Sequence, residues 1–312
     1  MSNKVIVTAA VHPFLLATLE EKGFEICYEP TLSYDELYLK IADAVGLIVT
    51  TRLQIDTKII DSAKALKWIG RLGSGMELID TALAESKGIL CVSSPEGNCT
   101  AVGEHNLGLL LNLMHRIHSA YGEIKMGQWI RDGNRGDELT GKKVGIIGFG
   151  HIGTAFAKVL TGFDVEIVAH DIYPRALGWQ QFPHVKMVQL ETIQQEAEVI
   201  SLHLPLTPLT KHFANAHFFE QLKQKPYFLS TCRGGVTSTQ AVLEAIQNQQ
   251  IRGAGLDVLE NEQLDTYSQA EKANLEVLMA LPNFILTPHI AGYSQEAYYK
   301  MSKILLKKLG II

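Results

Sequence analysis

The sequence is poor in cysteine, and its four cysteines form no recognisable pattern. Cys27, Cys91, Cys99 and Cys232 include no Cys-x-x-Cys pair and have no regular spacing. A chain of 312 residues is large enough to fold without disulfides, so we expect four independent, reduced thiols. This pattern argues against a disulfide scaffold and against a zinc site, and it favours a cytoplasmic protein.

Long hydrophobic runs and concentrated charge are also missing. The longest strongly apolar stretches, such as residues 107–114, are far shorter than the roughly 20 residues that a membrane-spanning helix needs. Only Lys4 precedes a short apolar run that His12 and Pro13 interrupt, which does not support a secretory signal. The net charge is −5 and the basic residues are scattered, so we expect neither a nucleic-acid nor a membrane partner.

The sequence does contain enough apolar residues for two cores. Apolar residues make up 46% of the 312 residues, and roughly 150 residues per domain suggests two domains. Short β-branched runs alternate with helical patterns, which predicts an α/β protein with parallel sheets. Strands are expected at residues 5–8, 24–28, 45–49, 68–72, 89–92 and 165–169, and helices at 13–22 and 294–309. Ser33 and Glu36 form a capping box that predicts the start of another helix.

Residues 101–114 are apolar on nearly every side and contain two glycines, Gly103 and Gly108. Small residues in such a helix indicate that another backbone approaches it closely. We therefore predict a buried helix here that links the two domains.

A buried strand then runs into a Gly-x-Gly-x-x-Gly loop formed by Gly148, Gly150 and Gly153. The first glycine permits a tight turn, the second lets the backbone approach a pyrophosphate, and the third lets helix and strand pack closely. The helix that starts at His151 and Ile152 would offer unpaired N–H groups and its dipole to the anion. The loop predicts a dinucleotide site.

Asp171 follows the next expected strand, 18 residues beyond Gly153. A carboxylate at this place accepts hydrogen bonds from the ribose hydroxyls and repels a 2′-phosphate, so NAD is favoured over NADP. Arg175 lies nearby in the sequence and keeps NADP open as the less favoured cofactor.

Seven short patterns along the chain carry a resemblance to one family. They lie at residues 73–75, 95–98 with 103–105, 148–153, 203–207, 233–235, 255–258 with 262, and 287–292. With these patterns the sequence resembles the D-isomer-specific 2-hydroxyacid dehydrogenases, which include phosphoglycerate dehydrogenases and hydroxypyruvate or glyoxylate reductases. Formate dehydrogenases are further relatives, but they generally carry Gln at the position of Glu262.

The resemblance implies two doubly wound parallel-sheet domains. A Rossmann NAD-binding domain of residues 101–287 would be inserted into a smaller, flavodoxin-like substrate domain of residues 1–100 and 288–312. The active site would lie in the cleft between them. Family members usually form homodimers through the cofactor domain, and residues 101–129 are the candidate contact.

The resemblance also implies a catalytic group of Arg233, Glu262 and His289, and the chemistry agrees. An imidazole can both donate and accept a proton near neutral pH, as the interconversion of a 2-hydroxy and a 2-oxo acid requires. A carboxylate on the other ring nitrogen would fix the tautomer of His289. A guanidinium would hold the substrate carboxylate and polarise the carbonyl.

Further residues are expected to bind cofactor or substrate. By resemblance, His203 and Pro205 lie near the cofactor, where His203 either packs or contacts the nicotinamide side, and Asp257 bonds the nicotinamide carboxamide. In the loop of residues 73–75, backbone N–H groups would be free to hold a carboxylate at Ser74 and Gly75.

Two arginines each have two possible roles. Arg52 and Arg71 could receive a second anionic group such as a phosphate, although a solvated or ion-paired role is the simpler interpretation. The chain also departs from the family: Ser230 and Ser238 stand where Asn and Asp are common, and Gln263 follows Glu262 where Pro is usual.

We therefore expect an NAD-dependent dehydrogenase of small 2-hydroxy or 2-oxo acids such as hydroxypyruvate, glyoxylate or 3-phosphoglycerate. The alternative is a non-catalytic, NAD-sensing protein that resembles the corepressors built on the same scaffold. Retention of all three catalytic residues argues against this alternative.

Overall fold

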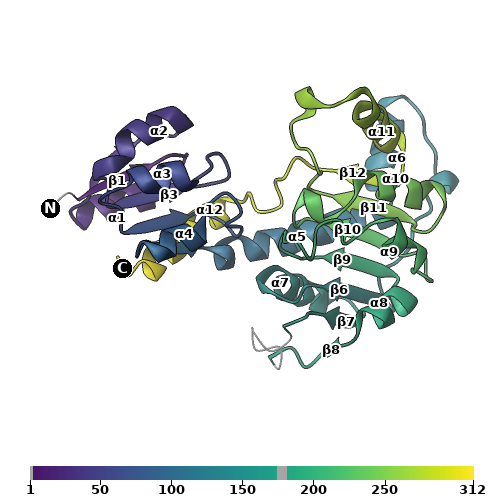
Figure 1. Cartoon of the computed structure of the whole chain (residues 1–312). Coiled ribbons are helices and arrows are strands. Elements are labelled where there is room, and N and C mark those ends of the chain that lie inside the picture. The colour runs from purple at the N-terminus through teal and green to yellow at the C-terminus, as the bar shows by residue number, and fades with distance from the viewer. Residues whose placement is uncertain (1–2, 174–180) are drawn as a thin grey trace. The chain divides into compact units, whose positions relative to one another are not determined.

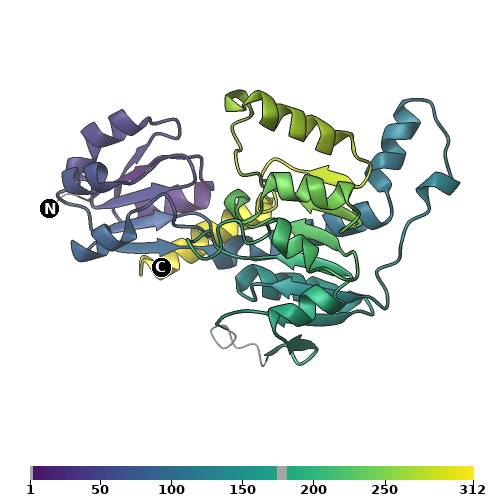
Figure 2. The ribbon, with the colours of Figure 1, turned by 45° about the vertical axis from the view of Figure 1, so that its right-hand side comes forward.

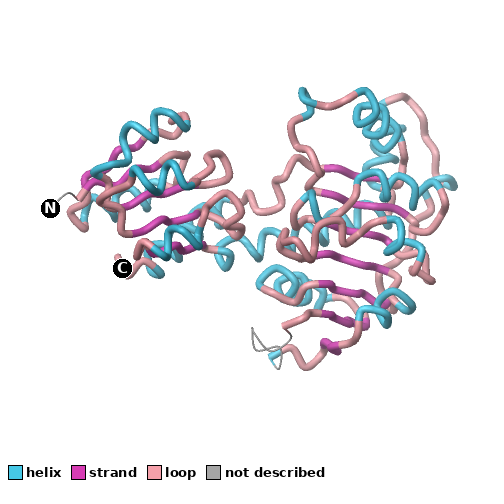
Figure 3. Tube along the Cα trace, in the orientation of Figure 1, coloured by secondary structure: helices cyan, strands magenta, loops and turns pink. Residues whose placement is uncertain are grey.

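The computed structural model describes residues 3–173 and 181–312, so the expectation for Arg175 lies outside the described residues. The chain forms two compact units, which we call unit 1 (Met1–Cys99 with Tyr293–Ile312) and unit 2 (Thr100–Gly292) (Figure 1). Each unit contains a sheet of parallel strands with helices between them (Figure 3). The predicted α/β class with two parallel sheets is confirmed.

Unit 1 is built on a five-stranded sheet with the order β2-β1-β3-β4-β5, in which every neighbouring pair is parallel. This is the doubly wound order of flavodoxin-like folds. The strands are β1 Lys4–Val7, β2 Glu25–Tyr28, β3 Gly46–Val49, β4 Trp68–Arg71 and β5 Leu90–Ser93. The helices between them are α1 Pro13–Glu21, α2 Tyr34–Lys40, η1 Ile41–Asp43, α3 Thr57–Ser62 and α4 Thr81–Ser86. The predicted capping box at Ser33 and Glu36 opens α2.

Both faces of this sheet are covered by apolar packing. Successive residues of a strand point to opposite faces, so Val5 joins one buried cluster and Ile6 the other. The cluster of Val5 includes Leu305 and Leu306 from the C-terminal helix α12, Gln295–Lys308. Figure 2 shows this yellow helix alongside the strands of unit 1. The last residues of the chain therefore complete the core of its first sheet.

Unit 2 is built on a seven-stranded parallel sheet with the order β12-β11-β10-β9-β6-β7-β8. Counted within the unit, this is the Rossmann order with one added edge strand. The strands are β6 Lys143–Ile147, β7 Glu166–His170, β8 Val185–Met187, β9 Val199–Leu202, β10 Tyr227–Ser230, β11 Gly253–Leu256 and β12 Phe284–Leu286. The strand order reverses direction between β6 and β9, where such sheets bind their ligands.

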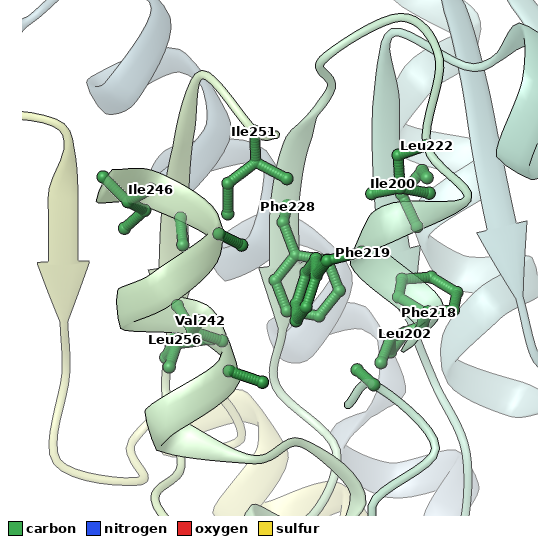
Figure 4. Close-up of a cluster of buried hydrophobic side chains, with 14 of the residues drawn as sticks. Ile200, Leu202, Phe218, Phe219, Leu222, Phe228, Val242, Ile246, Ile251 and Leu256 are labelled. Carbon is green, nitrogen blue, oxygen red and sulfur yellow. The ribbon is translucent and has the colours of Figure 1, made fainter. Parts of the chain in front are cut away.

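The helices of this unit after residue 115 are α6 Ile117–Lys125, η2 Asp132–Asn134, α7 His151–Val159, η3 Leu160–Gly162, α8 Leu190–Glu196, α9 Ala216–Glu220, η5 Gly234–Val236, α10 Thr239–Gln247, η6 Leu264–Thr266 and α11 Gln269–Ala280. Side chains of α9 and α10 join one buried cluster of the sheet and those of α7 join another, whereas α6 buries none of its side chains. One face holds the buried rings of Phe218, Phe219 and Phe228, packed among aliphatic side chains (Figure 4). This core holds in place the strands whose carboxyl ends lead into the candidate site.

The helix α5, Pro95–Met114, crosses the boundary between the two units in the sequence. At Gly103 an added Cβ would lie 3.0 Å from the backbone of Ala155, so the predicted close approach is confirmed there. The prediction is wrong for Gly108, where such a Cβ would meet nothing within 4 Å. The helix ends before Arg116, whose φ of 54° lies in the left-handed region and separates α5 from α6.

Candidate active site

The residues predicted for catalysis follow the carboxyl ends of three neighbouring strands. Arg233 follows β10, Glu262 follows β11, and His289 follows β12. β11 pairs in parallel with both β10 and β12, so these ends lie at one edge of the sheet. The carboxyl edge of an open α/β sheet is where ligands bind. The three side chains therefore come from loops that start side by side.

His289 and Glu262 are in direct contact. Nδ1 of His289 lies 2.9 and 3.0 Å from the two carboxylate oxygens of Glu262. An Nδ1–H that donates to a carboxylate leaves Nε2 as the ring nitrogen that can exchange a proton with a substrate. The two side chains are 36% and 46% exposed, so a small molecule can reach the imidazole from solvent.

The loop that carries His289 is held by the buried carboxylate of Asp257. This carboxylate accepts hydrogen bonds from Thr287 Oγ1 at 2.5 Å and from the backbone N–H groups of Ile290 at 2.9 Å and Ala291 at 2.7 Å. The backbone N–H of His289 donates to the carbonyl of Asp257 at 2.8 Å. His289 has a φ of 55°, in the left-handed region that few non-glycine residues adopt, and the surrounding bonds hold it there.

The loop that carries Arg233 packs against the loop that leads to Glu262. A Cβ added to Gly234 would lie 1.7 Å from the carbonyl oxygen of Leu259, so only glycine fits between them. Arg233 has an extended backbone, and its Nη1 donates to the carbonyl of Cys232 at 2.6 Å. The close approach of the two loops sets the position of the arginine relative to the acid.

A second acid–histidine pair ties the same loops together, and the sequence analysis missed it. Glu260 contacts Nε2 of His212 at 2.7 Å through one oxygen and accepts from the backbone N–H of Thr239 at 2.6 Å through the other. The backbone N–H of His212 donates to Gly235 at 2.8 Å. Glu260 and His212 lie in different loops with no shared motif, so no sequence pattern reveals them.

Two of the three departures from the family pattern, Ser230 and Ser238, have structural explanations. The hydroxyl of Ser230 lies 3.4 Å from the sulfur of Cys232 and accepts from Thr237 Oγ1 at 3.3 Å. Ser238 caps α10 by accepting from the N–H of Ala241. Small hydroxyl side chains thus satisfy the polar groups below and beside the arginine loop.

The glycine loop lies at the carboxyl end of β6, at the point where the strand order reverses. Gly148 has a φ of 92°, and a Cβ there would lie 2.5 Å from the carbonyl oxygen of His203 at the end of β9. A Cβ on Gly153 would lie 2.1 Å from the oxygen of Gly148, so the helix packs directly on the turn. Gly150 is the N-cap of α7 and supplies no side-chain cap. These features fit the binding of a cofactor diphosphate at the first turn, His151 and Ile152.

Asp171 lies beside this loop, one residue after β7. Its carboxylate accepts from the N–H of Phe149 at 2.7 Å and from the N–H of Tyr173 at 2.7 Å. The carboxylate is thereby anchored to the glycine loop, the position that recognition of a ribose requires.

His203 is buried and is bonded through Nε2 to Ser201 Oγ at 3.0 Å and to Asn106 Nδ2 at 3.4 Å. Burial lowers the pKa of His203 to about 3, so its ring is neutral at physiological pH. This environment suits packing at the cofactor loop and not proton transfer. Pro205 lies in the following turn, where its carbonyl accepts from Thr210 Oγ1 at 2.5 Å.

The candidate substrate loop of unit 1 follows β4. Ser74 and Gly75 are half-buried, and the hydroxyl of Ser74 contacts Asn98 Oδ1 at 3.3 Å. The expectation of free N–H groups is wrong for Gly73, which donates to the buried hydroxyl of Ser94 at 3.2 Å.

Arg52 and Arg71 bond to backbone carbonyls of unit 1. Nη2 of Arg52 donates to Thr8 at 2.9 Å and to Leu32 at 2.5 Å. Arg71 is buried and donates to the carbonyl of Leu72. The guanidinium of Arg52 thus ties together two loops at the carboxyl edge of this sheet, whereas that of Arg71 bonds to the residue that follows it.

Within residues 3–173 and 181–312, no group of three or more His, Cys, Asp or Glu side chains is placed to hold a metal ion. In the same ranges, no helix combines the length and the hydropathy that crossing a bilayer requires.

Comparison with known proteins places the chain in a family. Residues 107–291 match the model of the D-isomer specific 2-hydroxyacid dehydrogenase NAD binding domain. A glyoxylate reductase of Thermofilum pendens is 34% identical over 98% of this chain and 90% of its own length. A D-3-phosphoglycerate dehydrogenase of Methanocaldococcus jannaschii is 33% identical over 98% of this chain, which spans only 56% of that protein. The crystal structure of the TT0316 protein from Thermus thermophilus superposes with a TM-score of 0.85 at 31% identity, covering 99% of this chain and 96% of that one.

The chain therefore belongs to the D-isomer-specific 2-hydroxyacid dehydrogenases, and the family predicted from the seven patterns is confirmed. The part of the chain that carries the glycine loop is an NAD-binding domain of this family.

Proposed function

We propose that the protein is an NAD-dependent D-2-hydroxyacid dehydrogenase that interconverts a small 2-oxo acid and the corresponding 2-hydroxy acid. The observation that carries this proposal is the contact of His289 with Glu262, beside the loop of Arg233. The glyoxylate reductase and phosphoglycerate dehydrogenase among its relatives support this class of substrate. NADPH is the less favoured cofactor because Asp171 would lie close to a 2′-phosphate.

Bound NADH supplies the hydride that C2 of the 2-oxo acid accepts. In this direction Nε2 of His289 donates a proton to the oxygen on C2, and in the reverse direction it removes that proton. Glu262 accepts a hydrogen bond from Nδ1 and stabilises the imidazolium. The guanidinium of Arg233 holds the substrate carboxylate and polarises the adjacent carbonyl.

The remaining roles extend the same proposal. Gly148, Gly150, Gly153 and Asp171 hold the diphosphate and the ribose of the cofactor, and Asp257 contacts the carboxamide of the nicotinamide. Residues 1–100 with 288–312 form the substrate domain, which comprises unit 1 and the loop that carries His289, and in it Ser74 and Gly75 bind the substrate carboxylate. Arg52 and Arg71 are the candidates for a second anionic group, such as the phosphate of phosphohydroxypyruvate.

The test is a reductase screen of the full chain with glyoxylate, hydroxypyruvate, phosphohydroxypyruvate and pyruvate, each with NADH and NADPH. We expect turnover with NADH that disappears in His289→Ala. A wild-type protein that reduces none of the four acids would contradict the proposal. Tight NADH binding without turnover, together with a protein partner recovered in a pulldown, would favour the corepressor-like alternative.

We further propose a cytoplasmic homodimer that assembles through the cofactor domain, within residues 101–129. Large apolar side chains in this segment are exposed: Ile117, Tyr121, Ile124, Met126 and Trp129. The first three recur at the spacing of one helix face on α6, and a surface of this kind marks a protein contact. Sedimentation equilibrium should show a dimer at micromolar concentration, and Tyr121→Lys should dissociate it. A wild-type monomer at that concentration contradicts the dimer.

A further inference from the structure

A cavity of about 320 Å³ opens at the amino edge of the sheet in unit 2. On one side it is lined by Tyr227, the first residue of β10, and by Arg252 and Asn283, which directly precede β11 and β12. On the other side it is lined by the end of α5 and by the segment of residues 135–137. The catalytic residues follow the opposite ends of the same strands, so this cavity is separate from their site. Its volume lies within the range of about 300–1,000 Å³ typical of small-molecule sites.

The lining of this cavity is strongly cationic. Arg116, Arg135 and Arg252 line it together with a single acid, Asp137. The carboxylate of Asp137 accepts from the hydroxyl of Tyr227 at 2.8 Å and from Nη1 of Arg252 at 3.0 Å. These contacts, with the hydroxyl of Tyr227 first, hold the pKa of Asp137 below its ordinary value. The acid stays ionised and offsets the charge of Arg252, and Arg135 is paired with Asp132 at 3.4 Å. Of the three arginines in the lining, Arg116 is the one whose charge these two acids do not offset.

The backbone conformation fixes the segments that carry Arg116 and Arg135. Arg116 is a non-glycine residue at a φ of 54°, in the short connection between α5 and α6. Gly136 lies so close to α5 that a Cβ there would be 2.3 Å from the carbonyl oxygen of Met114. The N–H of Asp137 donates to that same carbonyl at 2.9 Å. The segment with Arg135 and Asp137 is thus pinned to the end of the helix that precedes Arg116.

We propose that this cavity is a second ligand site, which binds a small oxyanion. Guanidinium groups match the planar, forked geometry of phosphate and carboxylate oxygens, and the three arginines of the lining offer such groups around one cavity. Arg116 is half-buried and would be the main cation for this ligand, with the remaining N–H groups of Arg135 and Arg252 as its supports. A phosphate and a dicarboxylate share this chemistry, and the site does not depend on the proposed dehydrogenase activity.

The test is calorimetric titration of the full chain with inorganic phosphate and, separately, with malonate. We expect one of the two to bind the wild type, and we expect Arg116→Gln to weaken that binding tenfold or more, since a charge-assisted bond is lost. Arg131→Gln is the matched control, because Arg131 is exposed and is not part of the cavity lining. Arg135→Gln provides a second variant in case Arg116→Gln unfolds.

The variant Arg233→Gln distinguishes anion binding in this cavity from anion binding at the catalytic site. It should leave the anion affinity unchanged. If Arg233→Gln abolishes binding, the anion occupies the catalytic site and the proposal is wrong. It is also wrong if Arg116→Gln and Arg135→Gln bind like Arg131→Gln, or if neither anion binds the wild type. If the two lining variants instead dissociate a dimer without any anion effect, the cavity receives a side chain of a second copy, and the proposal fails.

Discussion

The two sheets of this protein have the same architecture, but different side chains lie at their carboxyl edges. Both are doubly wound and parallel, with apolar clusters on each face. At the carboxyl edge of unit 2, acids pair with histidines, as Glu262 does with His289 and Glu260 with His212. At the carboxyl edge of unit 1, the guanidinium groups of Arg52 and Arg71 are bonded to backbone carbonyls.

This contrast separates two tasks that one scaffold supports. An acid–histidine pair can move a proton near neutral pH, whereas a guanidinium stays charged and can only bind and orient. Under the proposed function, proton transfer falls to unit 2 and recognition of anionic groups falls to unit 1. Four variants probe the two units, with effects that decrease in size.

The largest effect is expected at the imidazole of unit 2. In His289→Ala, kcat for the 2-oxo acid should fall by about 10²–10⁴-fold, the usual contribution of a positioned general acid. Steady-state kinetics with NADH measures this loss. His217→Ala is the matched control, since that side chain is 80% exposed on α9, and its kcat should not change. Equal kcat values for the two variants would contradict the assignment of proton transfer to His289 in unit 2.

The next effect concerns the close packing that the glycine loop of unit 2 requires. Gly153→Ala should lower the free energy of unfolding by about 1–3 kcal/mol, because its Cβ would clash with the Gly148 carbonyl. Gly108→Ala is the matched control: it meets nothing within 4 Å inside a helix and should stabilise by about 0.5–1 kcal/mol. Urea unfolding of both variants measures the difference. A Gly153→Ala variant as stable as the wild type would contradict the close packing of α7 on the turn.

A pH-dependent effect follows from the buried imidazole of His203. Its pKa in the folded state is about 3, below the ordinary 6.5, so only the unfolded chain takes up a proton between these values. The stability that the neutral ring provides is present above pH 6.5 and is lost as the pH falls. Between pH 6.5 and 5.5 the wild type should lose about 1 kcal/mol more than His203→Gln does. Parallel losses in urea unfolding of the apo-proteins would show that the ring is solvated.

The smallest effect is expected in unit 1. Arg52→Gln removes bonds to the carbonyls of Thr8 and Leu32, and because Arg52 is exposed, it should cost at most about 1 kcal/mol of unfolding free energy. In steady-state kinetics its KM should rise for phosphohydroxypyruvate but not for glyoxylate, with kcat retained. A loss of kcat with every acid would contradict the division between the units.

Patterns of neighbouring residues in the sequence predicted the strands and helix starts well. The strand expected at residues 5–8 is observed at Lys4–Val7, and the capping box at Ser33 opens a helix as predicted. The sequence did not indicate the break at Arg116, a non-glycine residue whose backbone is left-handed. The sequence also did not predict the open space beside Gly108. Periodicity shows which residues are buried but not what lies against them.

The sequence by itself determined the class of the protein, the family, the cofactor loop and the identity of the candidate catalytic residues, because these depend on residue types at short or fixed spacings. Tertiary structure alone decided what those residues touch. The bond of Gly73 to Ser94, the anchoring of His289 by Asp257, the pair of Glu260 with His212 and the arginine-lined cavity all join residues from separate loops. The order of strands in a sheet brings such loops together, and no spacing along the chain encodes it directly.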